Sequence, residues 1–262
     1  MNIIQMKGLK EMLVQTEFVS DGRAAVVRLN RPRALNALNG ELLDALDAAL
    51  DSLAVHPDLR VVILTGSDSC FSVGADLKEQ LEDIDKRIGR MHRLVERLQT
   101  FPCASIAAIE GWALGGGLEL AMACTFRVAA PGAKLGLPEI KLGVIPSYGG
   151  TQLASRLLGS SRALELLCLG EPIDAARAEQ IGLVNWVADA PGKALALALD
   201  RAASLAERSP RALAAARQSV REGEGQPLGK ALDVEAAASA QLRVHGGIDA
   251  AAAFQAMQVK SP

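Results

Sequence analysis

The sequence predicts a layered α/β protein whose C-terminal part is helical. Short apolar runs typical of strands alternate with segments whose apolar residues recur at helical spacing. Half of the 262 residues are hydrophobic and 22% are charged, a composition typical of a globular chain with enough apolar material for a core. After about residue 190, the chain consists almost entirely of helix-forming residues.

Four apolar runs predict strands. Residues 24–30 are rich in β-branched side chains, and residues 59–66 form the continuous apolar run of a strand that is covered on both faces. Further strands are predicted at 104–111 and 126–130. Because helical segments separate these runs, we expect the strands and helices to form packed layers.

Helices are predicted between the strands. Residues 40–57 carry apolar residues at helical spacing and end at Pro57. A long charged helix is expected from about Lys78 to Gln99, and another helix follows the glycines at 115–117.

The C-terminal part differs in composition from the rest of the chain. Pro210 and Pro227 divide its run of helix formers into separate helices. Its surplus of alanine predicts close helix packing, with another subunit as one possible partner. We therefore expect a core with the active site at residues 12–200 and a helical region for subunit assembly at 201–262.

Charge and hydropathy argue against several classes of partner. The formal net charge is −2, which gives no electrostatic reason to expect nucleic acid or an anionic membrane. No apolar run approaches the roughly 18 residues that cross a bilayer. Residues 1–15 do not resemble a signal peptide, so we expect a cytoplasmic protein. Residues 1–11 have no strong helix cap, and we expect their deletion to leave activity and assembly unchanged.

The cysteines and histidines form no metal or redox motif in the sequence. Cys70, Cys103, Cys124 and Cys168 are widely scattered, without a C-x-x-C pair, and the three histidines show no ligand spacing. We therefore expect buried, reduced thiols and no metal.

The stretch GWALGGGLELAMAC, residues 111–124, combines two unfavourable features. Three consecutive glycines lose much backbone entropy on folding, and the Glu119 carboxylate is costly to bury unpaired in an apolar run. Glycines before a helix let a ligand approach the main chain, where the first N–H groups of the helix favour negative charge. The stretch therefore suits a developing negative oxygen, although a plain tight turn explains it about equally well.

Two further stretches favour a reactive site. Gly74 and Ala75, in CFSVGADLKE, predict a second small-residue bend, so that two bends can each offer one N–H group to a carbonyl oxygen. Glu139, in LGLPEIKLGVIPSYGGTQ, adds a carboxylate among apolar residues and turns. Glu119 and Glu139 are therefore candidates for a paired acid/base site. The alternative is that both are surface glutamates, which fits Glu139 better than Glu119.

Five segments in this order and spacing resemble the enoyl-CoA hydratase/isomerase (crotonase) family: NRPRALNAL, GADLKE, GWALGGGLELAMAC, LPEIKLGVIP and GGTQ. The resemblance runs from about residue 14 to the C-terminus and weakens after residue 200. It implies the crotonase fold, a spiral of β-β-α units with a helical C-terminal region that builds homotrimers or homohexamers. It also implies an acyl-CoA substrate and no separate cofactor, since coenzyme A is part of the substrate.

The resemblance also implies roles for particular residues. Ala75 and Gly116 match the positions whose backbone N–H groups bind the thioester oxygen. Glu119 and Glu139 match the two catalytic glutamates of the hydratases. The expected substrate-binding residues are Arg33, Ala34, Leu35, Gly74, Asp76, Leu77, Lys78, Gly115 and Ser147. The two basic residues among them match positions near the nucleotide end, although a solvated surface charge explains each equally well.

The activity implied by the resemblance is hydration of a 2-enoyl-CoA thioester, with Glu119 acting on the water and Glu139 on the α-proton. Both glutamates favour a hydratase, because isomerases of the family usually keep only the Glu139 position. The alternatives are an isomerase or other acyl-CoA enzyme and, from another class, a catalytically silent acyl-CoA-binding or scaffold subunit. An RNA-binding member is disfavoured, because the basic residues of the 78–99 helix are interspersed with acidic ones. Ser147 departs from the glycine that hydratases often have beside the catalytic water.

Overall fold

The computed structural model describes residues 12–79 and 84–246, and side chains as far as residue 243. The chain divides into two compact units, Met1–Glu207 and Arg208–Pro262. The expectation that residues 1–11 are dispensable therefore concerns a segment outside the described residues.

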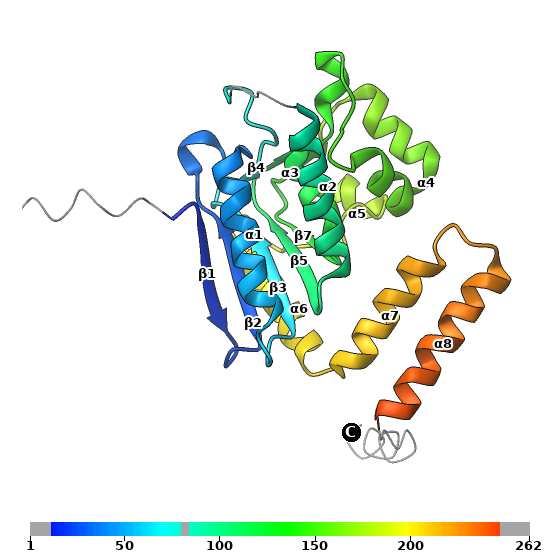
Figure 1. The fold of residues 1–262 in the computed structure, drawn as a ribbon. Coiled ribbons are helices and arrows are strands. Elements are labelled where there is room, and N and C mark those ends of the chain that lie inside the picture. The colour runs from blue at the N-terminus through cyan, green and yellow to red at the C-terminus, as the bar shows by residue number, and fades with distance from the viewer. Residues whose placement is uncertain (1–11, 80–83, 247–262) are drawn as a thin grey trace, which may run out of the picture. The chain divides into compact units, whose positions relative to one another are not determined.

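The first unit contains a six-stranded sheet in the order β1-β2-β3-β5-β7-β10 (Figure 1). Its strands are β1 (Val14–Val19), β2 (Ala24–Leu29), β3 (Val61–Thr65), β5 (Ala104–Ile109), β7 (Phe126–Ala129) and β10 (Trp186–Val187). β1 pairs with β2 in antiparallel fashion, and all other neighbours are parallel. The four strands predicted from apolar runs are confirmed as β2, β3, β5 and β7.

A second sheet of four short strands has the order β4-β6-β8-β9. Its strands are β4 (Cys70–Ser72), β6 (Trp112–Leu114), β8 (Lys134–Gly136) and β9 (Ile173–Asp174). β4, β6 and β8 follow β3, β5 and β7 in the chain, so each of three successive turns of the chain adds one strand to each sheet. A helix follows each pair, and this arrangement confirms the predicted spiral of β-β-α units.

The helices of the first unit pack on both faces of the six-stranded sheet. Figure 1 shows α1 and α2 over one face. The helices are α1 (Gly40–Ala54), α2 (Ile84–Thr100), α3 (Gly116–Ala123), α4 (Gly150–Leu169), α5 (Ala175–Gln180) and α6 (Ala194–Ala206), with 3₁₀ turns η2 (Pro32–Ala34) and η3 (Pro138–Leu142). The start predicted for the charged helix, at about Lys78, is wrong. Lys78 lies in a turn that its own N–H closes by donating to Asp76 Oδ1, and helix α2 begins at Ile84.

Helix α6 packs against the other face of the six-stranded sheet. Its buried Ala194, Ala198 and Ala202 belong to one apolar cluster with Val26 and Ile63 of the sheet. Small side chains at this spacing let a helix approach a sheet of β-branched residues closely. The predicted boundary after residue 200 falls inside this helix.

The second unit is a helical hairpin. Helices α7 (Pro210–Gly223) and α8 (Leu228–Gly246) are joined by a short loop, and a Cβ added at Gly223 would lie 3.3 Å from Ala231 Cβ. None of the residues in α7 is buried. The described side chains of α8, as far as residue 243, are not buried either, so these parts of the two helices do not make a core of their own.

The described residues also answer the expectations about cysteines, membrane spans and metal sites. The four cysteines, which all lie in the described part of the chain, form no disulfide; Cys70 and Cys124 are buried as expected, whereas Cys103 is half-buried and Cys168 is exposed. Over residues 12–79 and 84–246, no helix has the length and apolar character of a membrane span. The same residues contain no cluster of acidic, cysteine and histidine side chains that could hold a metal.

Candidate active site

Two glycine bends meet at the ends of neighbouring strands. β4 and β6 pair in parallel, so the bends that follow them lie at the same edge of the second sheet. Gly74 has a φ of 89°, and a Cβ there would lie 2.8 Å from both Gly116 N and Leu114 O. Only glycine fits at this position, because it combines the left-handed conformation with close backbone approach.

The bends present two free donors. The backbone N–H groups of Ala75 and Gly116 have no acceptor among the described residues. Ala75 is held on both sides, because Leu38 N donates to Gly74 O at 2.7 Å and Asp76 N donates to Leu38 O at 3.1 Å. Gly116 is the first residue of α3, where N–H groups lack a partner and the helix dipole favours negative charge. A carbonyl oxygen placed here would receive backbone hydrogen bonds.

Glu119 lies one turn into α3 and is 1% exposed, which excludes the surface interpretation. Its Oε1 accepts hydrogen bonds from Tyr148 N at 2.8 Å and from Gly150 N at 2.6 Å. Burial raises the pKa of Glu119 to about 8, with a smaller contribution from the nearby negative charge of Glu139, and this outweighs the opposing effect of the two N–H donors. A buried carboxyl with a pKa near neutrality can both take and give a proton.

The Glu139 carboxyl group lies beside the glycine run. It lies in the first turn of η3, and its Oε1 would be 2.6 Å from a Cβ at Gly115. Its Oε2 is buried without a hydrogen-bond partner in the described part of the chain, and burial raises the pKa of Glu139. The structure thus brings both predicted carboxyl groups beside Gly115 and Gly116.

The other predicted contact residues surround this centre to different degrees. The Asp76 carboxylate already accepts hydrogen bonds from other residues of the protein. Arg31 Nη1 donates to its Oδ2 at 2.6 Å, and hydrogen bonding from Lys78 N lowers the pKa of Asp76. Leu35 has a φ of 51° and is exposed, as are Leu77 and Lys78. The remaining predicted residues are Arg33 and Ala34 in η2, Gly115 beneath Glu139, and the half-buried Ser147.

The sequence did not indicate two further residues at the site. Tyr148 is the only tyrosine in the chain and is 8% exposed. A Cβ added at Gly116 would lie 2.8 Å from its ring, so the ring packs directly on the bend at Gly115 and Gly116. Arg87 is 7% exposed, and its guanidinium carbon lies 5.9 Å from the Tyr148 ring centroid. No pattern in the sequence distinguishes Arg87 from the other charges of α2.

Comparisons with known proteins agree with this geometry. The profile of the "Enoyl-CoA hydratase/isomerase" family matches residues 21–248. A "Probable enoyl-CoA hydratase" of Bacillus subtilis is 44% identical over 74% of this chain and 77% of its own. A "Short-chain-enoyl-CoA hydratase" of Clostridium acetobutylicum is 36% identical over 83% of this chain and 85% of its own. The crystal structure of an enoyl-CoA hydratase from Bacillus anthracis is similar, with a TM-score of 0.87 and 34% identity over 95% of this chain and 96% of that chain.

Proposed function

The chain belongs to the enoyl-CoA hydratase/isomerase family, and we propose that it hydrates a 2-enoyl-CoA thioester to a 3-hydroxyacyl-CoA. The observation that carries this proposal is the position of two carboxyl groups, the buried Glu119 and the half-buried Glu139, beside two unpaired backbone donors. Coenzyme A would enter as part of the substrate, and the reaction needs no other cofactor.

The two backbone donors would stabilise the reaction's intermediate. When water adds to the β-carbon of an α,β-unsaturated thioester, negative charge develops on the thioester oxygen. The N–H groups of Ala75 and Gly116 would donate to that oxygen, and removal of one such donor in other enzymes costs about 10²–10³ in rate. Because the bends are fixed before substrate binds, the donors need no reorganisation during the reaction.

The two glutamates would transfer the protons. In our proposal, Glu119 takes a proton from water as the water oxygen bonds to the β-carbon, and Glu139 gives a proton to the α-carbon. Burial raises the pKa of both carboxyl groups, and the negative charge of Glu139 adds to the shift at Glu119, so that ionising both groups at once is unfavourable. One carboxylate and one carboxylic acid are the two forms that this addition requires.

The second carboxyl group distinguishes hydration from isomerisation. Moving a double bond needs a proton removed from one carbon and returned to another, for which Glu139 alone would suffice. Glu119 is held by two backbone N–H groups at one oxygen, which leaves the other oxygen to orient water. In a subunit that serves only as a scaffold, removing these two carboxyl groups from water would cost free energy without a catalytic benefit.

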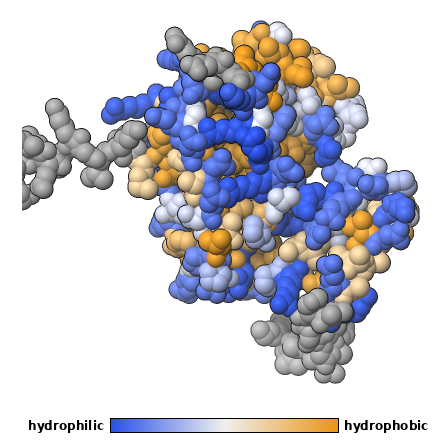
Figure 2. Space-filling view, in the orientation of Figure 1, coloured by the Kyte–Doolittle hydropathy of each residue, from blue (hydrophilic) through white to orange (hydrophobic). Residues whose placement is uncertain are grey.

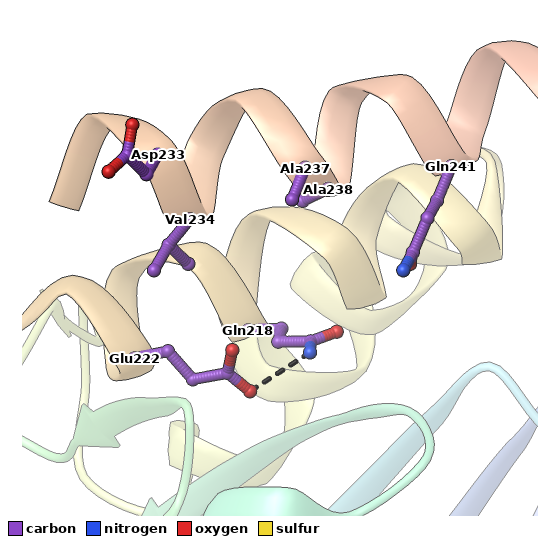
Figure 3. A pocket seen from close by; sticks show the side chains of 7 residues that line it. All are labelled: Gln218, Glu222, Asp233, Val234, Ala237, Ala238 and Gln241. Atoms are coloured by element: carbon purple, nitrogen blue, oxygen red, sulfur yellow. Dashed lines mark hydrogen bonds between the residues drawn. The ribbon is translucent and has the colours of Figure 1, made fainter. Parts of the chain in front are cut away.

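We also propose that the protein assembles as a homotrimer or homohexamer through residues after 200. In the second unit, Val220, Leu228 and Leu232 are exposed, and the hairpin has no core of its own. A hollow of about 340 Å³ lies between α7 and α8. Figure 3 shows side chains that line it, among them Gln218 and Glu222. Gln218 Nε2 donates to Glu222 Oε1 at 2.9 Å. Apolar faces that a hairpin cannot bury internally are typical of subunit contacts.

The first unit carries a second apolar surface. Figure 2 shows it over the segment from η3 to α4. Its exposed side chains include Leu142, Val144, Ile145, Leu164 and Leu169. This surface supports further contacts between subunits. We also propose a cytoplasmic location, which cysteines without disulfides suit.

Incubation with a panel of 2-enoyl-CoA thioesters, followed by mass spectrometry, tests the proposed activity. We expect a product heavier by one water. A double-bond shift without mass gain would replace hydration by isomerisation. Binding of the thioesters without any reaction would favour the scaffold alternative. The double variant Glu119→Gln and Glu139→Gln controls for contaminating hydratase.

A further inference from the structure

We propose that the ring of Tyr148 closes the acyl-binding space and restricts the enzyme to short-chain 2-enoyl thioesters. This inference rests on the proposed function and specifies its substrate class. It arises from the position of one side chain between the proposed catalytic groups and the buried Arg87, which pairs with Glu79.

Tyr148 is fixed at the reacting centre by its own backbone. Its N–H group donates to Glu119 Oε1, and Gly150 N, two residues later, donates to the same oxygen. The ring extends from this position onto Gly116: a Cβ added there would lie 2.8 Å from Tyr148 Cδ2 and 3.1 Å from Cε2. The ring therefore packs on one proposed oxyanion donor while its backbone holds one proposed catalytic carboxylate.

This position lies along the path of the acyl chain. The thioester oxygen would be at the N–H groups of Ala75 and Gly116, and the β-carbon would face the Glu119 carboxyl. Carbons beyond the β-carbon must then continue past the segment that holds Glu119, where the Tyr148 ring already occupies the space. A short acyl chain ends before the ring, whereas a longer one has to displace it.

The ring is backed by groups that resist displacement. Arg87, whose guanidinium carbon is 5.9 Å from the ring centroid, donates from Nη1 to Glu79 Oε2 at 2.9 Å and from Nη2 to Leu38 O. The other oxygen of Glu79 accepts from Gly40 N at 2.8 Å. Moving the ring outward would therefore disturb a buried arginine and its ion pair with the half-buried Glu79, and a buried charge that loses its partner is destabilising.

Helix α2 also holds the chain just before Tyr148. His92 Nε2 donates to Ser147 O at 2.7 Å. A Cβ added at Gly149, on the other side of Tyr148, would lie 3.5 Å from Val95 Cγ1 of the same helix. Contacts on both sides of Tyr148 limit the backbone movement that would otherwise swing the ring aside.

The test compares crotonyl-CoA, hexenoyl-CoA and decenoyl-CoA as substrates of the wild type, Tyr148→Ala and Tyr148→Phe. Each variant keeps the backbone N–H that binds Glu119. For the wild type, we expect kcat/KM to fall from crotonyl-CoA to decenoyl-CoA. Tyr148→Ala should raise the ratio of decenoyl-CoA to crotonyl-CoA turnover by about tenfold or more, since a single methylene in a pocket is worth about 10–200-fold. Tyr148→Phe keeps the ring and should keep the wild-type profile.

A binding measurement makes the outcome independent of turnover. The unreactive decanoyl-CoA should bind Tyr148→Ala more tightly than the wild type by calorimetry, while butyryl-CoA should show no such gain. Should Tyr148→Ala fail to fold, Tyr148→Leu, which restores part of the volume, should give an intermediate shift. Unchanged chain-length profiles and unchanged decanoyl-CoA affinity in a folded variant would overturn the inference. Lack of hydration of every thioester by the wild type would instead overturn the proposed function.

Discussion

Replacing Glu119 by glutamine is expected to stabilise the protein while inactivating it. Burial raises the pKa of Glu119 from its ordinary 4.5 to about 8. Below about pH 4.5 the carboxyl is protonated in both folded and unfolded chains. As pH rises from about 4.5 to about 8, the unfolded chain releases this proton and the folded chain retains it, so the wild type loses stability across that window. Glutamine does not titrate and escapes this loss.

The size of the effect follows from the pKa difference. Since one pH unit corresponds to about 1.4 kcal/mol, the gap between 4.5 and about 8 corresponds to an upper limit of about 5 kcal/mol. The amide oxygen of glutamine still accepts from Tyr148 N and Gly150 N, but more weakly than a carboxylate. We therefore expect a net gain of about 1–3 kcal/mol near pH 8, or about 2–4 °C in Tm for each kcal/mol.

The assay is urea unfolding of both proteins at several pH values and at one protein concentration, because assembly makes stability depend on concentration. The matched control is Glu110→Gln. Glu110 is also buried and accepts two backbone hydrogen bonds, from Gly192 N and Ala194 N, but these donors lie at the start of α6 and not at the candidate site. This control should lose stability. The reasoning is refuted if Glu119→Gln is less stable than the wild type near pH 8, or if the difference between them does not grow with pH.

Three further predictions concern catalysis, packing and assembly. Glu139→Gln should lower hydration by about 10²-fold or more with the fold intact, as circular dichroism would show; near-wild-type turnover would remove Glu139 from the mechanism. Gly116→Ala should both destabilise the protein and abolish most activity, because its Cβ would lie 2.8 Å from the Tyr148 ring; a fully active, equally stable variant would contradict the packing at this bend. Light scattering at micromolar concentration should show a trimer or hexamer, and a stable monomer would count against assembly through the second unit.

Much of the spiral was predictable because its central strands are continuous apolar runs. β3 and β5 are buried along their whole length, so burial on both faces leaves a clear pattern in the sequence. The strands of the second sheet are only two or three residues long, and β6 and β8 lie beside glycines. Such short segments have no periodicity of their own, and their pairing is set by the strands that precede them.

The helical assignments show where local pattern is insufficient. Helix α6 has the same alanine-rich composition as the C-terminal helices, yet it packs on the six-stranded sheet. Lys78 is followed by helix-forming residues, but the Asp76 side chain accepts its backbone N–H and closes a turn there. The position of α6 is set by contacts with strands distant in the chain, and the turn at Lys78 is set by a local side-chain hydrogen bond.

The candidate site was predictable where chemistry left an unusual residue in the sequence. The sequence predicted a reactive site from Glu119, a carboxylate in an apolar run, and from the glycines beside it. Tyr148 and Arg87 carried no such signal, because an aromatic residue in a loop and an arginine on a charged helix are common. Their role depends on contacts between α2 and the loop before α4, which only the folded structure brings together.

The most direct test of the central claim is hydration of crotonyl-CoA in deuterated, heavy-oxygen water by the wild type, Glu119→Gln and Glu139→Gln. Fragmentation of the product locates each label. If both glutamates act as proposed, the wild type places heavy oxygen on the β-carbon and one deuterium on the α-carbon, and each variant forms this product about 10²-fold more slowly or worse. Wild-type rates in both variants would contradict the paired-glutamate mechanism.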